Sequence, residues 1–328
     1  MKNFSFYIII TILIFSSCRR DTTPNLSLNI NEDILMIISK SDIFGTYHNV
    51  VHADIPEKSR IQVEGFVQYK TMLNVQDEIW IFASRRNDED HVYTYDDETF
   101  NFVESYPLLK AKAYHYYEGA IYALRDSFIR RFNVNAEQIA TDIQLSTRPD
   151  RYAFDEFIGA FDIGDGQIEI YNLLDGKKIS EWSASGHIKN ILLNDGKIFI
   201  HTEDNRIPVS YFGELENIEN LDTMNIIAPV ENCKLDYYDD QGFINGELIL
   251  NCDRKYYATS DNILSEEDEF FRDSLYYEMT MNDLTDQIFF YNKDTLIEYD
   301  YLDQKVISSM PIGIEDSRYY IYDVFTLE

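Results

Sequence analysis

The sequence is poor in the residues and motifs that mark many catalytic centres. It has 3 Cys, 6 His and 2 Trp in 328 residues, with no Gly-x-Ser-x-Gly nucleophile turn and no glycine-rich phosphate loop. The usual signals of a serine hydrolase and of a nucleotide-phosphate site are therefore missing, and no catalytic residue can be named from the sequence.

Positive charge is also scarce. Lys and Arg number 28 against 58 Asp and Glu, which gives a formal net charge of −30. Such a charge repels phosphate backbones, so nucleic acid is excluded as an expected partner. The acidic residues are scattered through turns, which indicates a solvated surface.

Long hydrophobic runs are absent except at the N-terminus. Lys2 precedes an apolar run from Phe4 to Phe15, which is too short to span a membrane and has the length of a signal-peptide core. Ser16 and Ser17 then lead into Cys18. This pattern predicts a lipoprotein signal peptide over residues 1–18, with Cys18 as the lipidated first residue of the mature protein. An ordinary secretory signal with an incidental cysteine is the alternative.

The anchored protein is expected to face the periplasm. Residues 19–25 read as a polar tether. Arg19 and Arg20 stand where some surface-displayed lipoproteins carry an acidic run, which favours an outer-membrane anchor with the domain in the periplasm over surface display.

Aromatic and β-branched residues are abundant. The chain has 25 Tyr and 21 Phe, and Tyr, Phe, Ile, Asp and Asn replace helix formers. This composition is typical of strands joined by Asx turns. Residues 26–328 are expected to form a single all-β domain.

A repeat with two anchors specifies the fold more closely. One anchor is an aromatic residue that closes a strand before Asp or Asn, and its successive spacings run from 37 to 44 residues. The anchor residues are Tyr95, Phe132, Tyr171 and Tyr299, with looser matches at Phe212 and Tyr256. Upstream of each lies the second anchor, a strongly apolar strand such as Ile79–Phe82. A period near 40 with several short strands per unit predicts a β-propeller.

The blade number follows from the count of units. Six units carry both anchors, so six blades of four antiparallel strands are favoured. Residues 61–67 and 319–327 also read as strands, and if both join one sheet a composite seventh blade results. A two-sheet sandwich is the alternative architecture, but it accommodates the repeat poorly.

One segment breaks the β pattern. Ser265 to Asp268 reads as a capping box, and apolar residues follow at roughly helical spacing. A short helix over 266–279, inserted between the fifth and sixth units, is expected.

The lipobox-like Phe15-Ser16-Ser17-Cys18, followed by six propeller-type units, resembles the six-bladed β-propeller lipoproteins of Bacteroidota envelopes. The resemblance covers nearly the whole mature chain at the level of architecture. The sequence lacks the Gly-Pro-Gly-type loop that members of this family often carry. It implies an envelope protein with a binding or scaffolding role, and it transfers no catalytic residue.

Few residues suggest metal or acid–base chemistry. His48 and His52 are spaced for a metal on a helix, but their β-branched surroundings indicate strand or loop, where they would lie about 13 Å apart. His115-Tyr116-Tyr117 could supply the acid and base of a propeller lyase, although packing explains the triplet more simply.

Three acidic turns, at 95–98, 162–166 and 238–242, offer oxygen ligands for Ca²⁺. None has EF-hand spacing, and Asx turns explain them equally well. No metal site or cofactor is therefore predicted, with Ca²⁺ kept as a hypothesis.

Cys233 and Cys252 are the remaining cysteines. If the hairpin between them is centred between Gly242 and Phe243, they lie directly opposite and within disulfide reach. Two buried free thiols are the alternative.

The function best supported by the sequence is a membrane-anchored envelope lipoprotein whose propeller binds or scaffolds a protein or a glycan. A carbohydrate-active lyase or hydrolase, with its site at the mouth of the central channel, is the runner-up. Converging His, Tyr, Arg and carboxylate side chains at that mouth would favour catalysis.

Overall fold

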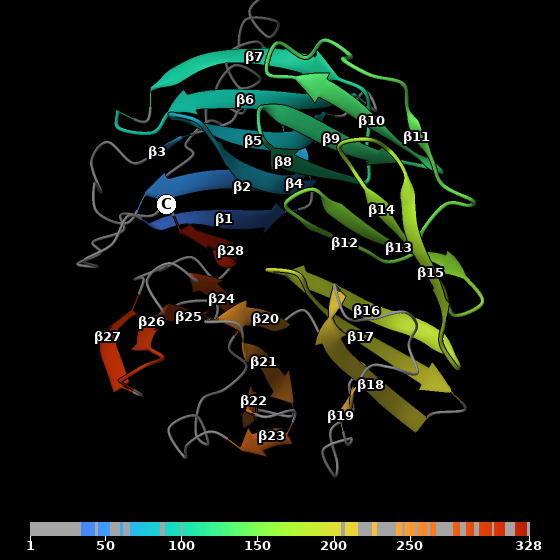
Figure 1. Ribbon diagram of the computed structural model, residues 1–328. Helices are drawn as coiled ribbons and strands as arrows, with labels where there is room; N and C mark the ends of the chain where they lie inside the picture. Colours follow the sequence, from blue (N-terminus) through green and yellow to red (C-terminus); the bar gives the residue numbers. More distant parts are fainter. Residues whose placement is uncertain are drawn as a thin grey trace, which may run out of the picture.

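The computed structural model is an all-β propeller. It describes residues 34–42, 45–52, 60–61, 66–85, 89–99, 101–204, 207–215, 225–227, 241–244, 247–252, 255–260, 263–266, 278–282, 287–291, 295–303, 305–311 and 319–326. Within these ranges, seven antiparallel sheets of four strands are arranged around a ring (Figure 1). The predicted fold class is confirmed.

Six of the sheets use four consecutive strands. They are β4 (Phe66–Val75), β5 (Glu78–Arg85), β6 (Asp90–Asp96) and β7 (Phe102–Leu108); β8 (Ala113–Tyr117), β9 (Ala120–Arg125), β10 (Phe128–Asn133) and β11 (Ile143–Gln144); β12 (Tyr152–Asp155), β13 (Ile158–Gly164), β14 (Gln167–Asn172) and β15 (Lys178–Ser183); β16 (His187–Asn194), β17 (Lys197–Asp204), β18 (Ile207–Glu214) and β19 (Asn225–Ile227); β20 (Gln241–Ile244), β21 (Glu247–Cys252), β22 (Lys255–Ser260) and β23 (Ile263–Glu266); and β24 (Glu278–Asn282), β25 (Gln287–Tyr291), β26 (Thr295–Asp300) and β27 (Lys305–Pro311).

The seventh sheet joins the two ends of the described chain. β28 (Tyr319–Thr326) pairs with β1 (Ile34–Asp42), which pairs with β2 (Gly45–His52) and then β3 (Arg60–Ile61). Figure 1 shows the red β28 beside the blue β1. The favoured count of six was thus one short. A composite blade is observed, but its N-terminal strands are residues 34–42, 45–52 and 60–61, and Phe66 and Val67 of the expected strand 61–67 belong to β4. The N-terminal unit lacks the repeat's aromatic anchor, because β2 ends at His52 without an aromatic–Asx pair.

Each of the two sequence anchors has a fixed place in the four-stranded sheets. Each apolar anchor forms the second strand of its sheet, as Ile79–Phe82 does in β5. Each of the four good aromatic–Asx pairs ends a third strand. The Asx side chain then caps the turn that follows: Oδ1 of Asn133 accepts hydrogen bonds from the backbone N–H groups of Asn135 (3.0 Å) and Glu137 (2.9 Å).

The core lies between neighbouring sheets. One cluster, which includes Phe82 and Ile121, joins the second strands of the β4–β7 and β8–β11 sheets. The next, which includes Tyr122 and Phe161, joins β8–β11 to β12–β15. Ile121 and Tyr122 are adjacent in β9 and face opposite neighbours, so an unbroken apolar run is required where both faces of a strand are covered.

Two local predictions need correction. Ser265 and Glu266, the expected helix start, belong to β23, and Met279 at the expected end belongs to β24. The intervening residues 267–277 lie outside the described residues. In the hairpin of β20 and β21, Ile244 faces Glu247, so the turn is centred between Asn245 and Gly246.

This register removes the basis for the disulfide prediction. A centre three residues later than assumed shifts every cross-strand partner, so Cys252 is no longer placed opposite position 233. Cys233 itself lies outside the described residues, as do the signal peptide over 1–18, Cys18 and the tether over 19–25.

Candidate functional site: a basic pocket where three sheets meet

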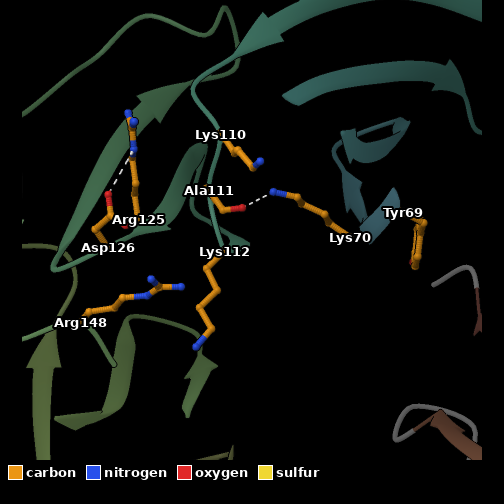
Figure 2. A pocket seen from close by; sticks show the side chains of 8 residues that line it. All are labelled: Tyr69, Lys70, Lys110, Ala111, Lys112, Arg125, Asp126 and Arg148. Atoms are coloured by element: carbon orange, nitrogen blue, oxygen red, sulfur yellow. Dashed lines mark hydrogen bonds and ion pairs between the residues drawn. The ribbon is translucent and has the colours of Figure 1, made fainter. Parts of the chain in front are cut away.

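The described residues include a pocket of about 520 Å³ with a strongly basic wall. It lies on the face of the ring that carries the connections between successive sheets, here called the linker face. Figure 2 shows the residues that line it, which are Tyr69, Lys70, Lys110, Ala111, Lys112, Arg125, Asp126 and Arg148.

Three neighbouring sheets supply this lining. Tyr69 and Lys70 come from β4, the first strand of its sheet, and residues 110–112 form the connection from β7 to β8. Arg125 ends β9 and Asp126 begins the turn to β10, while Arg148 lies in the connection from β11 to β12. Antiparallel sheets place all these connections and turns at one end of the ring.

The pocket reverses the sign of the protein's charge. Five of its eight lining residues are cationic and one is anionic, in a chain whose formal net charge is −30. In the part of the chain that the structure describes, the guanidinium of Arg148 makes no hydrogen bond or ion pair. Nε of Arg125 lies 3.8 Å from Oδ2 of Asp126, which leaves this pair loose.

A buried carboxylate fixes one wall of the pocket. Oδ2 of Asp90 accepts hydrogen bonds from Nζ of Lys70 (2.6 Å), the Tyr114 hydroxyl (2.6 Å) and the Ala111 N–H (2.8 Å), and Oδ1 accepts one from Ser84 (2.7 Å). Lys70 also donates to the Ala111 carbonyl. Asp90 therefore ties β4 and β6 of one sheet to the first strand of the next.

The environment of Asp90 alters two pKa values. Burial alone would raise the pKa of Asp90, but its hydrogen bonds with Lys70, Tyr114, Ala111 and Ser84 hold it below the ordinary value. Burial, together with the adjacent Asp90 carboxylate, raises the pKa of Tyr114. The tyrosine therefore remains a hydrogen-bond donor to a charged acceptor.

Lys112 is held in the same way against the next sheet along the ring. Its ammonium group donates to the carbonyls of Pro149 and Asp150, each at 2.8 Å, and lies 5.2 Å from the centre of the Tyr152 ring. Burial, with the nearby Arg148 and Arg151, lowers the pKa of Lys112, although Asp150 offsets part of this effect.

These contacts repeat around the ring. Lys70 and Lys112 each lie six residues before a turn residue with positive φ, Gln76 and Glu118, and Arg151 lies five residues before Glu156. Lys70 donates to the next sheet's connection at Ala111, Lys112 donates at Pro149, and Arg151 donates from Nε to the Lys189 carbonyl (2.8 Å). A basic residue at this position was visible in the repeat but was not recognised.

The sequence-predicted site residues lie elsewhere. His115 in β8 stacks on Phe154, with ring centres 5.2 Å apart, and its Nε2 lies 2.6 Å from the Glu156 carbonyl. Burial lowers the pKa of His115. These are packing contacts, and His115 does not line the pocket. His48 and His52 both belong to β2, which confirms the strand interpretation.

Two of the acidic turns behave as Asx turns. Oδ1 of Asp162 accepts a hydrogen bond from the Gly164 N–H (2.9 Å), and Oδ1 of Asp96 accepts one from the Thr99 N–H (2.7 Å). Most of the third turn, residues 238–240, lies outside the described residues. Among the residues that are described, no three His, Cys, Asp or Glu side chains gather closely enough to hold a metal ion.

The described ranges also contain no helix of the length and apolar character needed to cross a membrane. No protein-family model matches the sequence, and no curated protein matches it.

Solved structures resemble the chain in fold. Kluyveromyces lactis Hsv2 is 12% identical over 82% of this chain and 94% of its own, with a TM-score of 0.51. A form of KlHsv2 with loop 6CD replaced by a Gly-Ser linker reaches 0.55 over the same shares. The computationally designed Ika8 protein is 10% identical over 76% of this chain and 88% of its own, with a TM-score of 0.50. At these identities the likeness defines the fold alone.

Proposed function

We propose that this chain is a lipid-anchored binding module of the bacterial envelope, and that its propeller binds an anionic ligand in the basic pocket of the linker face. The alternatives drawn from the sequence were a protein or a glycan as ligand. A concave pocket of about 520 Å³ lies within the range of small-molecule sites, about 300 to 1,000 Å³, and so favours a glycan or another small ligand.

The observation that carries the proposal is the charge of the lining. Asp90 already compensates Lys70, but the other cationic lining residues outnumber Asp126, and the excess of positive charge is offset when an anion binds among them. At about 4 Å, each opposite charge attracts by about 1 kcal/mol in water and about 4 kcal/mol at a partly screened protein surface. Arg148 is exposed and unpartnered within the described chain, so it can meet a carboxylate, sulfate or phosphate with two parallel hydrogen bonds.

The lining does not match the set of groups expected of a catalytic site. Tyr, Arg and Asp are present among its eight residues, but histidine is not. The arrangement supports binding of charge, and the carbohydrate-active alternative gains no specific observation from this pocket.

Membrane attachment is supported by the sequence pattern at Phe15-Ser16-Ser17-Cys18. If Cys18 carries the lipid, Cys18→Ala should move the protein from the membrane to the soluble periplasmic fraction. Unchanged membrane association in fractionation would show that another element holds the protein there.

The pocket is tested with the full chain and plain anions. Sulfate or phosphate should raise the thermal unfolding midpoint in a saturable way, and Arg148→Gln should abolish that effect. Lys177→Gln, which removes an exposed cation in the turn after β14, is the matched control and should leave it unchanged. Equal responses in the two variants would contradict binding at this pocket.

A further inference from the structure

We infer that the ligand of the proposed anion site is a short anionic saccharide, meaning a sugar that carries a carboxylate, sulfate or phosphate group. This inference rests on the proposed function. The inference comes from the one residue that looks out of place in the pocket, Asp126.

Asp126 is the one carboxylate of a lining that contains five cationic residues. Its carboxylate is 66% exposed and lies 3.8 Å from Nε of Arg125, which is a loose contact. A pocket for a bare anion gains nothing from a carboxylate, because the two negative charges repel. The residue is useful if the ligand also presents hydrogen-bond donors.

The neighbouring charges decide which donors these are. An ammonium group at Asp126 would meet the five cations of the same lining, so a zwitterion such as an amino acid is disfavoured. Hydroxyl groups donate to a carboxylate without carrying charge. A ligand that combines an anionic group with neighbouring hydroxyls is a sugar acid or a sugar ester of sulfate or phosphate.

Figure 2 supports a division of the pocket along these lines. Arg125, Asp126 and Arg148 lie to the left of the connection that carries residues 110–112, whereas the side chains of Lys110 and Lys70 lie to its right. Lys70 is occupied by Asp90, and Lys112 by two backbone carbonyls. Arg148, whose guanidinium makes no hydrogen bond or ion pair within the described residues, is the group we expect to meet the anion, and Asp126 the group we expect to meet the hydroxyls.

The charge of the whole chain limits the length of the ligand. A long polyanion bound at the pocket would extend beyond its basic lining along a protein whose formal net charge is −30, and would be repelled by it. The pocket therefore fits a single sugar or a chain end better than an internal segment of a polymer.

The test compares matched probes with the full chain by titration calorimetry. Glucuronate carries a carboxylate and hydroxyls, cyclohexanecarboxylate has the ring and carboxylate alone, and glucose has the hydroxyls alone. Glucose 6-phosphate and glucose 6-sulfate distinguish the source of the anion, and a long polyuronate tests length. We expect the sugar anions to bind about ten-fold more tightly than cyclohexanecarboxylate, because of the added charge-assisted hydrogen bonds.

Variants of Asp126 give effects of opposite sign for the two probe classes. Asp126 has φ of +39°, so glycine and asparagine are the replacements its backbone tolerates. Asp126→Gly should weaken glucuronate binding about ten-fold and leave cyclohexanecarboxylate equal or tighter, because a repelling charge is gone. Asp126→Asn keeps an acceptor and should fall between. Asp165→Gly is the control, since Asp165 has φ of +53° and lies in the corresponding turn of the next sheet, outside the pocket lining.

The outcomes separate the two proposals. If cyclohexanecarboxylate binds as tightly as glucuronate and Asp126→Gly affects both alike, the saccharide inference is wrong while the anion site stands. If glucose binds as well as glucuronate, or no probe binds, the anion site fails and the saccharide inference fails with it. A polyuronate that binds far more tightly per uronate than the monosaccharide overturns the limit on length.

Discussion

The ammonium group of Lys70 lies 2.6 Å from Oδ2 of Asp90, a carboxylate with no exposure to solvent. The Lys70 side chain is itself only 8% exposed, so both charges depend on each other for compensation. The pair joins the first and third strands of one sheet and, through Ala111 and Tyr114, the first strand of the next. It therefore supports both the interface between two blades and one wall of the basic pocket.

Asp90→Asn should strongly destabilise the protein. The substitution leaves the Lys70 charge buried without its counter-charge, and such a loss costs about 3 to 5 kcal/mol in the free energy of unfolding. Urea unfolding of the full chain measures it. Glu98→Gln, which removes an exposed carboxylate from the turn after β6, is the control and should change stability by less than about 0.5 kcal/mol. A similar small cost for both variants would contradict the role given to Asp90.

The same carboxylate predicts a dependence on pH. Asp90 has a folded pKa below its ordinary value of 3.8, so the unfolded chain binds this proton more readily than the folded protein. Its contribution to stability is thus complete above about pH 3.8 and is lost as the pH falls through the folded pKa. The difference in stability between the wild-type chain and Asp90→Asn should be large at pH 7 and smaller at pH 3. A difference independent of pH would rule this out.

Gly186 should tolerate alanine far less well than Gly119. Both have positive φ, +87° and +77°, so a side chain is strained at either position. A Cβ at Gly186 would also lie 2.3 Å from the Glu203 carbonyl oxygen, whereas nothing lies within 4 Å at Gly119. Thermal unfolding should show a cost of about 1 kcal/mol for Gly119→Ala and about 3 kcal/mol or more for Gly186→Ala. Equal costs would mean that the backbone yields at Gly186.

Asn133→Ala should cost about 1 kcal/mol, by analogy with the loss of a helix cap, because two backbone N–H groups lose their acceptor. Asn135→Ala, at an exposed position two residues later, should cost little, since the backbone N–H of Asn135 is retained. Denaturant midpoints of the two variants give the comparison. A larger effect at Asn135 would refute the capping role of the aromatic–Asx anchor.

Removal of residues 319–328 should abolish cooperative unfolding. β28 pairs with β1 through seven residue pairs, and its loss leaves the ring open with an unpaired strand edge. Size-exclusion chromatography should show association, and circular dichroism should show a broad transition at lower temperature. Removal of residues 327 and 328 alone leaves β28 intact and serves as the control. A monomeric, cooperatively unfolding truncated chain would show that six sheets suffice.

The features that the sequence predicted are those decided locally. An Asx side chain that caps its own turn, as Asn133 does, is encoded within five residues, and it marked the third strands correctly. The hairpin of β20 and β21 was also encoded locally. Asn-Gly at 245 and 246 is the strongest short hairpin signal, and giving it priority would have set the observed register.

The features that the sequence did not predict depend on distant contacts. A composite blade was only the alternative to six blades, and β1 was not identified as the partner of β28, because nothing near Ile34 indicates pairing with Thr326. The pocket gathers Lys70, Arg125 and Arg148 from three sheets, so no motif contains them together. The repeated position of Lys70 and Lys112 was the available signal, because both lie six residues before a turn residue with positive φ.

The pairing of β1 with β28 also has a consequence for biogenesis. The first described strand finds its inner neighbour only after Tyr319–Thr326 has been synthesised, so every other sheet is made before the ring can close. During that time β1 presents an open edge to any other chain in the same state. The unfinished chain is therefore prone to association through β1 until β28 is in place.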